Sequence, residues 1–160
     1  MRRLTLEPLT ADAFAPFGDV IEVSGEFGRH YFSDALGNAR PAVPPSLSVT
    51  TKAPSALPLT LTAMERHEYS SQTFVPMDVA RWMVVVAPHG ADGGPDIDGM
   101  RGFLARGDQG VTFGVDVWHA PNAVLDRPSR MAIFMWAAGD DGDEEFRDLP
   151  EPVMLVANGG

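Results

Sequence analysis

The sequence contains no cysteine. Disulfide bonds, zinc sites built on thiolates and cysteine nucleophiles are therefore excluded, and any metal would need histidine and carboxylate ligands. Basic residues are also scarce, because Lys and Arg total 12 against 22 Asp and Glu, giving a formal net charge of −10. This charge argues against a nucleic-acid partner, since binding to phosphates depends on a basic surface.

Long hydrophobic runs are missing as well. No segment has the roughly 20 uninterrupted apolar residues of a membrane span, and the start of the chain, Met1-Arg2-Arg3-Leu4, becomes polar too soon for a signal peptide. We therefore expect a cytoplasmic protein with no membrane partner. The 160 residues show no repeat or linker, so we expect one domain over residues 1–160.

Helical periodicity is nearly absent from the chain. Short apolar runs separated by Gly and Pro are typical of an all-β sandwich or barrel. The pattern predicts one short helix over residues 11–17, with Thr10 as its N-cap and Gly18 as its stop. Residues 81–87 are almost continuously apolar, which predicts a strand buried on both faces.

One polar stretch, residues 64–77, carries many of the side chains suited to chemistry. If Glu65, His67 and Tyr69 lie on a strand, the period of two points them to one face. Arg66 then points to the other face, where we expect a structural ion pair with Glu68 or the acidic tail. A face that looks into a barrel would line a pocket. The competing interpretation is an edge strand whose polar residues meet water.

The spacing of these residues resembles the two cupin motifs. Glu65-x-His67 and then Gln72 stand in the frame of the first motif, and His119, after the turn at residues 107–110, stands in that of the second. The neutral Gln72 is a poor substitute for an anionic metal ligand. We therefore predict a cupin-like antiparallel β-barrel, a double-stranded β-helix with one or two short helices, that holds no tightly bound metal and no cofactor.

A larger set of residues resembles the ureidoglycolate lyase family, also called the ureidoglycolate hydrolase family. The set comprises Leu6–Thr10, Phe14–Glu22, Leu57-Pro58-Leu59, Met64–His67, Ser71-Gln72, Val84–Pro88, the Trp118-His119-x-Pro121 turn and Asp143–Glu145. It covers most of the chain, and the combination in this order is specific.

The resemblance implies a lyase that cleaves (S)-ureidoglycolate to glyoxylate and urea in allantoin and purine-nitrogen breakdown. A base removes the hydroxyl proton, the C–N bond breaks as the carbonyl forms, and an acid protonates the departing nitrogen. His67 is the expected base, because Glu65 in the same row would raise and orient its basicity. His119 is the expected acid or donor to a substrate oxygen.

Four further side chains are expected to bind the substrate. Gln72 can donate to the carboxylate and accept from the ureido group, and Tyr69 shares the predicted face. Lys52 would hold the carboxylate as a point charge, and Trp118 directly precedes the second histidine. The acidic run over residues 140–145 is expected to be a solvated face. The resemblance also favours a homodimer.

Several positions depart from the family pattern. Ala120 stands where a second histidine is usual, Thr51 stands where an arginine is expected, and Met135-Trp136 stands where Asp-Arg is common. The loss of two guanidinium groups weakens the expected carboxylate pocket. The alternative is therefore a cupin-like module that binds a small polar ligand, or an enzyme with a changed substrate.

Overall fold

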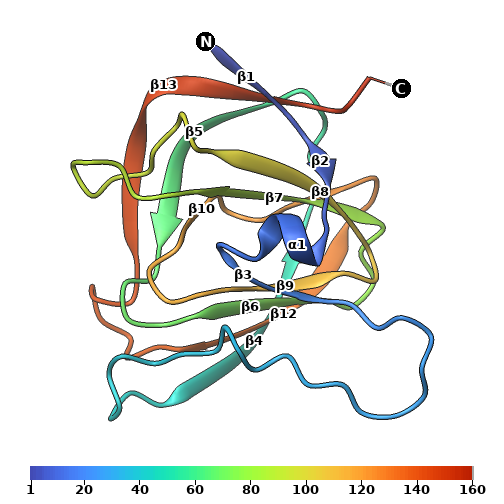
Figure 1. The fold of residues 1–160 in the computed structure, drawn as a ribbon, viewed down its shortest axis with the longest axis vertical. Helices are drawn as coiled ribbons and strands as arrows, with labels where there is room; N and C mark the ends of the chain where they lie inside the picture. Colours follow the sequence, from blue (N-terminus) through green and yellow to red (C-terminus); the bar gives the residue numbers. More distant parts are fainter. Residues whose placement is uncertain (160) are drawn as a thin grey trace.

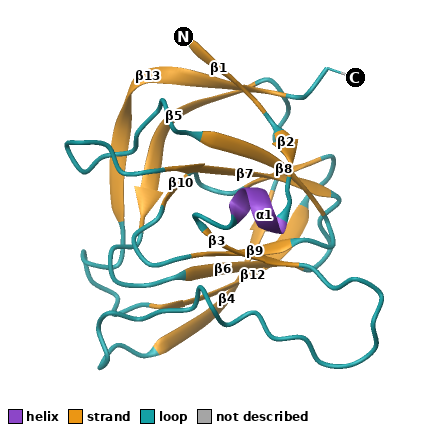
Figure 2. Ribbon diagram, in the orientation of Figure 1, coloured by secondary structure: helices purple, strands orange, loops and turns teal. Residues whose placement is uncertain are grey.

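The structure, a computed structural model, describes residues 1–159 and consists almost entirely of strands and loops (Figures 1 and 2). Its elements in chain order are β1 (Arg2–Thr5), β2 (Glu7–Pro8), α1 (Ala11–Phe14), β3 (Gly18–Ile21), β4 (Pro45–Lys52), β5 (Leu59–Arg66), β6 (Gln72–Pro76), β7 (Arg81–Ala87), β8 (Arg101–Arg106), β9 (Gly110–Phe113), β10 (Trp118–His119), β11 (Ala123–Leu125), β12 (Ser129–Trp136) and β13 (Glu145–Val156).

The strands form two sheets around a common interior (Figure 1). The first sheet has the order β1-β13-β5-β10-β7-β8-β2, with β11 paired to β7, and the second has the order β3-β9-β6-β12-β4. The pairs β1–β13 and β2–β8 are parallel, and the other pairs of the described strands are antiparallel. The predicted all-β, cupin-like barrel is confirmed.

Two apolar clusters pack against the first sheet, one on each face. In β7, Trp82 and Val84 belong to the cluster between the sheets, while Met83 and Val85 belong to the cluster on the opposite face. Successive side chains of a strand point to opposite faces, so a strand between two apolar layers must be apolar throughout. The predicted strand with two buried faces is confirmed.

The short helix α1 contributes Phe14 to the cluster between the sheets. The hydroxyl of Thr10 accepts a hydrogen bond from the Ala13 amide at 3.2 Å, which confirms the predicted N-cap. The chain then turns into β3 at Gly18, where a Cβ would lie 1.8 Å from the carbonyl oxygen of Thr112. A glycine is therefore required there. This helix has only four residues and is far too short to cross a membrane.

The proline-rich tail forms the long strand β13, which the sequence pattern did not predict. Its register against β5 shifts between Asp148 and Val153, and Pro150 and Pro152 lie within that shift. Proline has no N–H to donate to a ladder, so an irregularity is where a paired strand can accept it.

The chain over residues 110–119 is divided between the two sheets. β9 pairs with β3 and β6 in the second sheet, whereas β10 pairs with β5 and β7 in the first. The chain crosses over in the turn between them, where Asp116 has a φ of 68°. This crossing places His119 directly opposite Glu65 in the ladder between β10 and β5.

Candidate active site

Three titratable side chains meet beside the apolar cluster between the sheets. Glu65 lies on β5, His67 follows the end of that strand, and His119 lies on β10. All three are buried, and one carboxylate oxygen and one ring nitrogen of each histidine lie within 4.8 Å of one another. Glu65 and His67 thus share one face, as the period of two predicts.

His67 has one engaged and one unpartnered ring nitrogen. Its Nδ1 lies 2.8 Å from the carbonyl oxygen of Asp143, and a carbonyl only accepts, so Nδ1 carries the proton and donates. Nε2 then carries the lone pair, is buried and has no hydrogen-bond partner within residues 1–159. Buried polar atoms are rarely left unpaired, because each costs about 1–3 kcal/mol. The free Nε2 therefore marks where a ligand would bind.

His119 is held on both sides of its ring. Nδ1 donates to the carbonyl oxygen of Val117 at 2.9 Å, and the ring stacks on Phe113 with the centroids 4.2 Å apart. Nε2 lies 3.0 Å from Oε1 of Gln72 and 3.5 Å from Oε1 of Glu65. Both of these oxygens accept hydrogen bonds, so the arrangement suits a proton on Nε2 as well as on Nδ1. The resulting imidazolium can serve as an acid.

The pKa values of Glu65 and His67 are both lowered. Burial raises the pKa of the Glu65 carboxyl, but its hydrogen bond to His119 and the positive charges around it outweigh burial. Burial and the charge of His119 lower the pKa of His67, and the opposing effects of the Asp143 carbonyl and the Glu65 charge are smaller. Glu65 raises the pKa of His67, as expected, but burial and the charge of His119 outweigh this effect, and the group that orients the ring is the carbonyl of Asp143.

Glu65, His67 and His119 are together called the histidine cluster. Lys52 brings a positive charge to the edge of this cluster. It is the only lysine of the chain, it ends β4, and its Nζ donates to the carbonyl oxygen of Asn122 at 2.8 Å. Burial lowers the pKa of Lys52, and the charge of Glu65 opposes this effect. Thr51 points to the other face of β4 and is exposed. Position 51 therefore lies outside the cluster.

Strand alternation also determines where the other side chains that depart from the family pattern lie. Met135 pairs with Gln72 between β12 and β6, and its Sδ lies 3.7 Å from the amide nitrogen of Gln72. Trp136 is the next residue and lies on the outer face of the sheet. Ala120 belongs to the apolar cluster on the far side of the first sheet. A histidine at position 120 would not join His119.

Two residues predicted to bind substrate do not face the cluster. β5 ends before Tyr69 and the chain turns, so the alternation stops, and the Tyr69 ring lies 5.1 Å from the guanidinium carbon of Arg40. Trp118 points to the face opposite its neighbouring histidine, where it is fully buried and its indole N–H donates to the carbonyl of Gly93 at 3.1 Å. We assign neither side chain a contact with the substrate.

Arg66 points away from the cluster, as predicted. Its guanidinium pairs with Glu145 of the acidic segment at 2.6 Å and with Asp116 at 2.8 Å. It also lies over the ring of Trp118, with its central carbon 5.0 Å from the ring centroid. The predicted structural ion pair with the acidic tail is confirmed.

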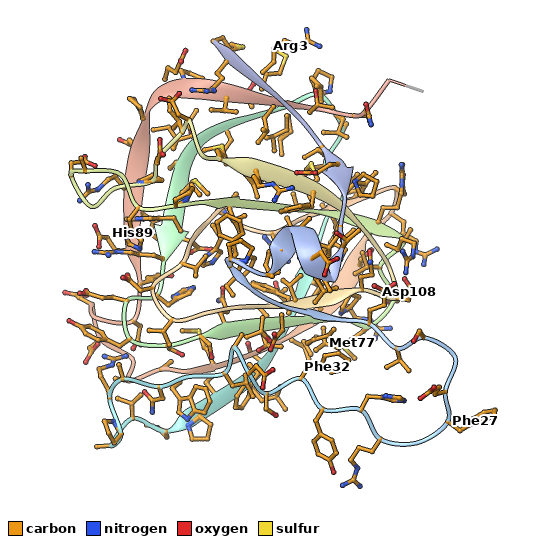
Figure 3. All side chains as sticks on the ribbon, viewed as in Figure 1. Arg3, Phe27, Phe32, Met77, His89 and Asp108 are labelled. Atoms are coloured by element: carbon orange, nitrogen blue, oxygen red, sulfur yellow. The ribbon has the colours of Figure 1, made fainter. Side chains whose placement is uncertain are left out.

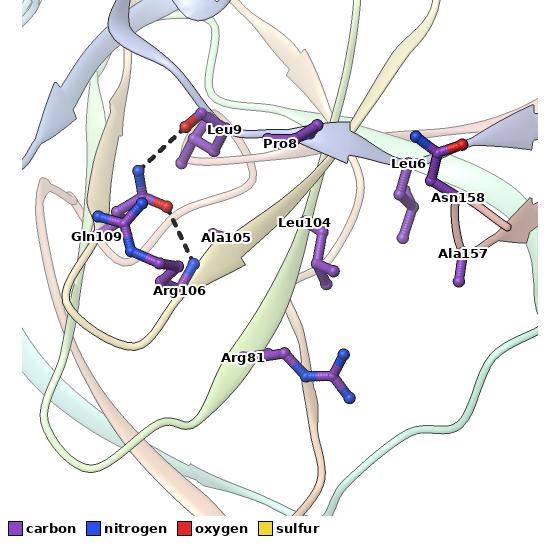
Figure 4. A pocket seen from close by; sticks show the side chains of 10 residues that line it. All are labelled: Leu6, Pro8, Leu9, Arg81, Leu104, Ala105, Arg106, Gln109, Ala157 and Asn158. Carbon is purple, nitrogen blue, oxygen red and sulfur yellow. Dashed lines mark hydrogen bonds between the residues drawn. The ribbon is translucent and has the colours of Figure 1, made fainter. Parts of the chain in front are cut away.

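An apolar groove with a volume of about 380 Å³ lies elsewhere (Figure 4). Its guanidinium groups, on Arg81 and Arg106, form ion pairs with Asp126 and Glu22. Gln109 donates to the carbonyl of Leu9 and accepts from the amide of residue 106 (Figure 4). Because these polar groups already have partners, we place the chemistry at the histidine cluster.

The histidine cluster can also hold a metal. Two imidazoles and a carboxylate are a ligand set for divalent transition metals, and the unpartnered Nε2 of His67 fits a ligand role. A metal bound there would polarise a substrate oxygen. The three side chains are better placed to bind a metal than the sequence suggested, because Glu65 and both histidines form a ligand set that does not require Gln72 as a ligand.

The fold and the cluster together define a class of protein, a cupin-like β-barrel with two histidines and a carboxylate gathered inside it. A family model described as ureidoglycolate lyase matches residues 1–155. A putative ureidoglycolate lyase of Agrobacterium fabrum is 38% identical over 156 residues, covering 97% of this chain and 96% of that protein. Ureidoglycolate lyases of Brucella melitensis and Pseudomonas paraeruginosa are 37% and 34% identical and cover 89% and 97% of this chain, and 88% and 96% of their own lengths. The chain belongs to the ureidoglycolate lyase family.

We keep the prediction of no tightly bound metal, because Nε2 of His119 faces the oxygens of Gln72 and Glu65, and a proton there takes up the lone pair that a metal needs. Elemental analysis of protein purified without added metal should give far less than one zinc, nickel, iron or manganese per chain. His67→Ala tests the cluster directly, and His89→Ala is the control, because His89 is exposed and pairs with the carbonyls of Gly93 and Asp116. One metal per chain that disappears only in His67→Ala would contradict the prediction.

Proposed function

We propose that the protein is a ureidoglycolate lyase that converts (S)-ureidoglycolate to glyoxylate and urea in allantoin and purine-nitrogen breakdown. The observation that supports this most is the buried, unpartnered Nε2 of His67 beside a second histidine and a carboxylate, in a chain of this family. The proposal needs a small-molecule substrate, places the reaction in the cytoplasm and needs no redox cofactor.

His67 acts as the base in this reaction. The reacting carbon of ureidoglycolate carries a hydroxyl, a carboxylate and the ureido nitrogen. Nε2 of His67 removes the hydroxyl proton, the C=O bond of glyoxylate forms, and the C–N bond breaks with its electron pair leaving on nitrogen. The hydrogen bond from Nδ1 to Asp143 keeps the lone pair on Nε2.

His119 acts as the acid that completes the cleavage. Its Nε2 proton passes to the departing urea nitrogen, so one proton leaves the substrate oxygen and one arrives at nitrogen. Glu65 stabilises the imidazolium before the transfer, because its carboxylate lies 3.5 Å from Nε2. No water is consumed, which distinguishes this elimination from a hydrolysis.

Lys52 and Gln72 bind the substrate in this proposal. The ammonium group attracts the substrate carboxylate at the edge of the cluster, where partial burial strengthens the attraction. The amide of Gln72 holds His119 through its oxygen, and its NH₂ group can donate to the ureido oxygen.

Loss of either histidine should remove turnover. His67→Ala and His119→Ala are each expected to lower kcat by about 10²-fold or more, because general acid and base catalysis contribute at least that much. His89→Ala serves as the control with unchanged turnover. Glyoxylate release is measured above the spontaneous rate. If the wild type binds another small acid and leaves ureidoglycolate intact, the protein is the binding module or changed enzyme of the alternative.

The acid side of the pH profile should report His67. Its pKa is lowered from 6.5, so the neutral base survives to more acidic pH, and kcat/KM should fall with a midpoint below 6.5. Over the same range the unfolded chain binds the proton first, so stability falls as the pH drops through 6.5 toward the folded-state pKa. His67→Gln should lose this component of the acid destabilisation. A kinetic midpoint above the ordinary histidine value would contradict the assignment.

Lys52→Ala should chiefly raise KM and leave kcat little changed, because the ion pair with the carboxylate is present in both the ground state and the transition state. Binding should also weaken with salt, since a point charge near the surface is screened. Lys52→Arg keeps the charge and is the matched control. Steady-state kinetics that show a fall in kcat at constant KM would reject this role.

The proposed partner is a second copy of the chain. The outer face of the second sheet exposes Leu47, Val49 and Val75, at 75%, 56% and 41%. The long loop between β3 and β4 projects from the barrel with fully exposed Phe27 at its tip (Figure 3). Contiguous exposed apolar surface usually marks an interaction site. A symmetric pair of copies would cover both surfaces with the same residues.

Light scattering during size-exclusion chromatography should give the mass of a dimer for the wild type. Leu47→Lys with Val49→Lys should give a monomer, because two charges would be buried in the interface. Phe146→Lys is the control, since Phe146 is exposed on β13 in the other sheet. A wild type that is monomeric at micromolar concentration would rule out the homodimer.

A further inference from the structure

The connection between β12 and β13 is organised by the carboxylate of Asp143. This carboxylate accepts hydrogen bonds from the amides of Ala138 at 2.8 Å and Gly139 at 2.7 Å, and from Nη2 of Arg40 at 2.6 Å. Burial raises the pKa of Asp143, but these donors outweigh it and lower the pKa to about 2. The carboxylate is therefore ionised near neutral pH, and its hydrogen bonds fix the conformation of the loop over residues 138–143.

Arg40 is distant from this loop in the sequence. The chain at Arg40 also contacts the turn that follows His67, through a main-chain hydrogen bond and a cation–π contact with Tyr69. The amide of Ala39 donates to the carbonyl of Tyr69 at 2.7 Å. The guanidinium of Arg40 lies over the Tyr69 ring and is mostly buried. One ion pair thus ties the turn that carries His67 to the loop that carries Asp143.

The main-chain carbonyl of Asp143 accepts the only hydrogen bond that the ring of His67 makes among the described residues, from Nδ1 at 2.8 Å. Which nitrogen of a neutral histidine carries the proton is set by the hydrogen bond that the other one makes. If the carbonyl moved away, the proton could occupy Nε2, and His67 would lose its lone pair toward the substrate.

We propose that the ion pair between Arg40 and Asp143 is a positioning device for the base. It fixes the loop over residues 138–143, so that the Asp143 carbonyl holds His67 in the tautomer with the proton on Nδ1. Arg40 and Asp143 are positioning residues and touch no reacting atom. The inference rests on the proposed role of His67, and its test includes a measurement that needs no turnover.

Asp143→Asn is the most selective variant, because it keeps the main-chain carbonyl and removes the negative charge that holds Arg40 and the two loop amides. Arg40→Ala removes the other partner, and Arg40→Lys restores the charge without the planar fork. Asp78→Asn is the matched control. Asp78 accepts from the amide and the guanidinium of Arg130 in the same manner but lies outside the site.

The ring nitrogens of His67 are observed by ¹⁵N NMR of the whole chain, with its four histidines assigned by single substitutions. The wild type and Asp78→Asn should show a proton on Nδ1. Asp143→Asn and Arg40→Ala should shift the population toward the Nε2 proton. In the kinetic assay they should lose about 10- to 100-fold in kcat, as expected for the partner that orients a functional histidine. KM should change little, and Arg40→Lys should recover part of the loss.

The outcomes separate this inference from the proposed function. If the wild type does not cleave ureidoglycolate, the proposed function fails, while a changed tautomer in Asp143→Asn still supports the positioning role. If Asp143→Asn and Arg40→Ala fold and retain the wild-type ¹⁵N spectrum of His67, the positioning role is wrong whatever the activity. A rise in KM at constant kcat would also overturn it.

Discussion

The pairing of His119 with Glu65 between β10 and β5 is the constraint on which the candidate site depends. It exists because the chain leaves the second sheet after β9, turns and enters the first sheet at β10. This crossing sends Trp118 into the outer apolar layer and His119 into the interior. The same two-residue strand therefore anchors the fold with one side chain and supplies the chemistry with the other.

The enclosed cluster gives its two histidines different tasks. Their ring centroids lie 5.2 Å apart, and two imidazolium ions so close together in a buried site would repel each other strongly. Glu65 supplies one negative charge, which is enough to stabilise one positive charge. His119 faces that carboxylate and suits the protonated form, whereas burial and the charge of His119 keep His67 neutral. A neutral histidine beside one that faces a carboxylate can therefore act as the base and its neighbour as the acid.

Much of this arrangement follows from local patterns in the sequence. Runs separated by Gly and Pro predicted the barrel, and strand alternation predicted that Glu65 and His67 share a face. The assignment failed for Tyr69 because the pattern does not show where β5 ends. The prolines in β13 prevented its prediction as a strand. The role of Asp143 was missed because it acts through its main chain on a histidine 76 positions away. The acidic run expected to be solvated supplies that contact, and only the folded chain reveals it.

The measurement that tests the account most directly is the fate of racemic ureidoglycolate incubated with the wild-type protein, followed by chiral chromatography together with assays for glyoxylate, urea and ammonia. The account predicts rapid loss of the (S) enantiomer, with glyoxylate and urea released in equal amounts and no ammonia. Loss of both enantiomers at the spontaneous rate, or release of ammonia in place of urea, would contradict the lyase assignment.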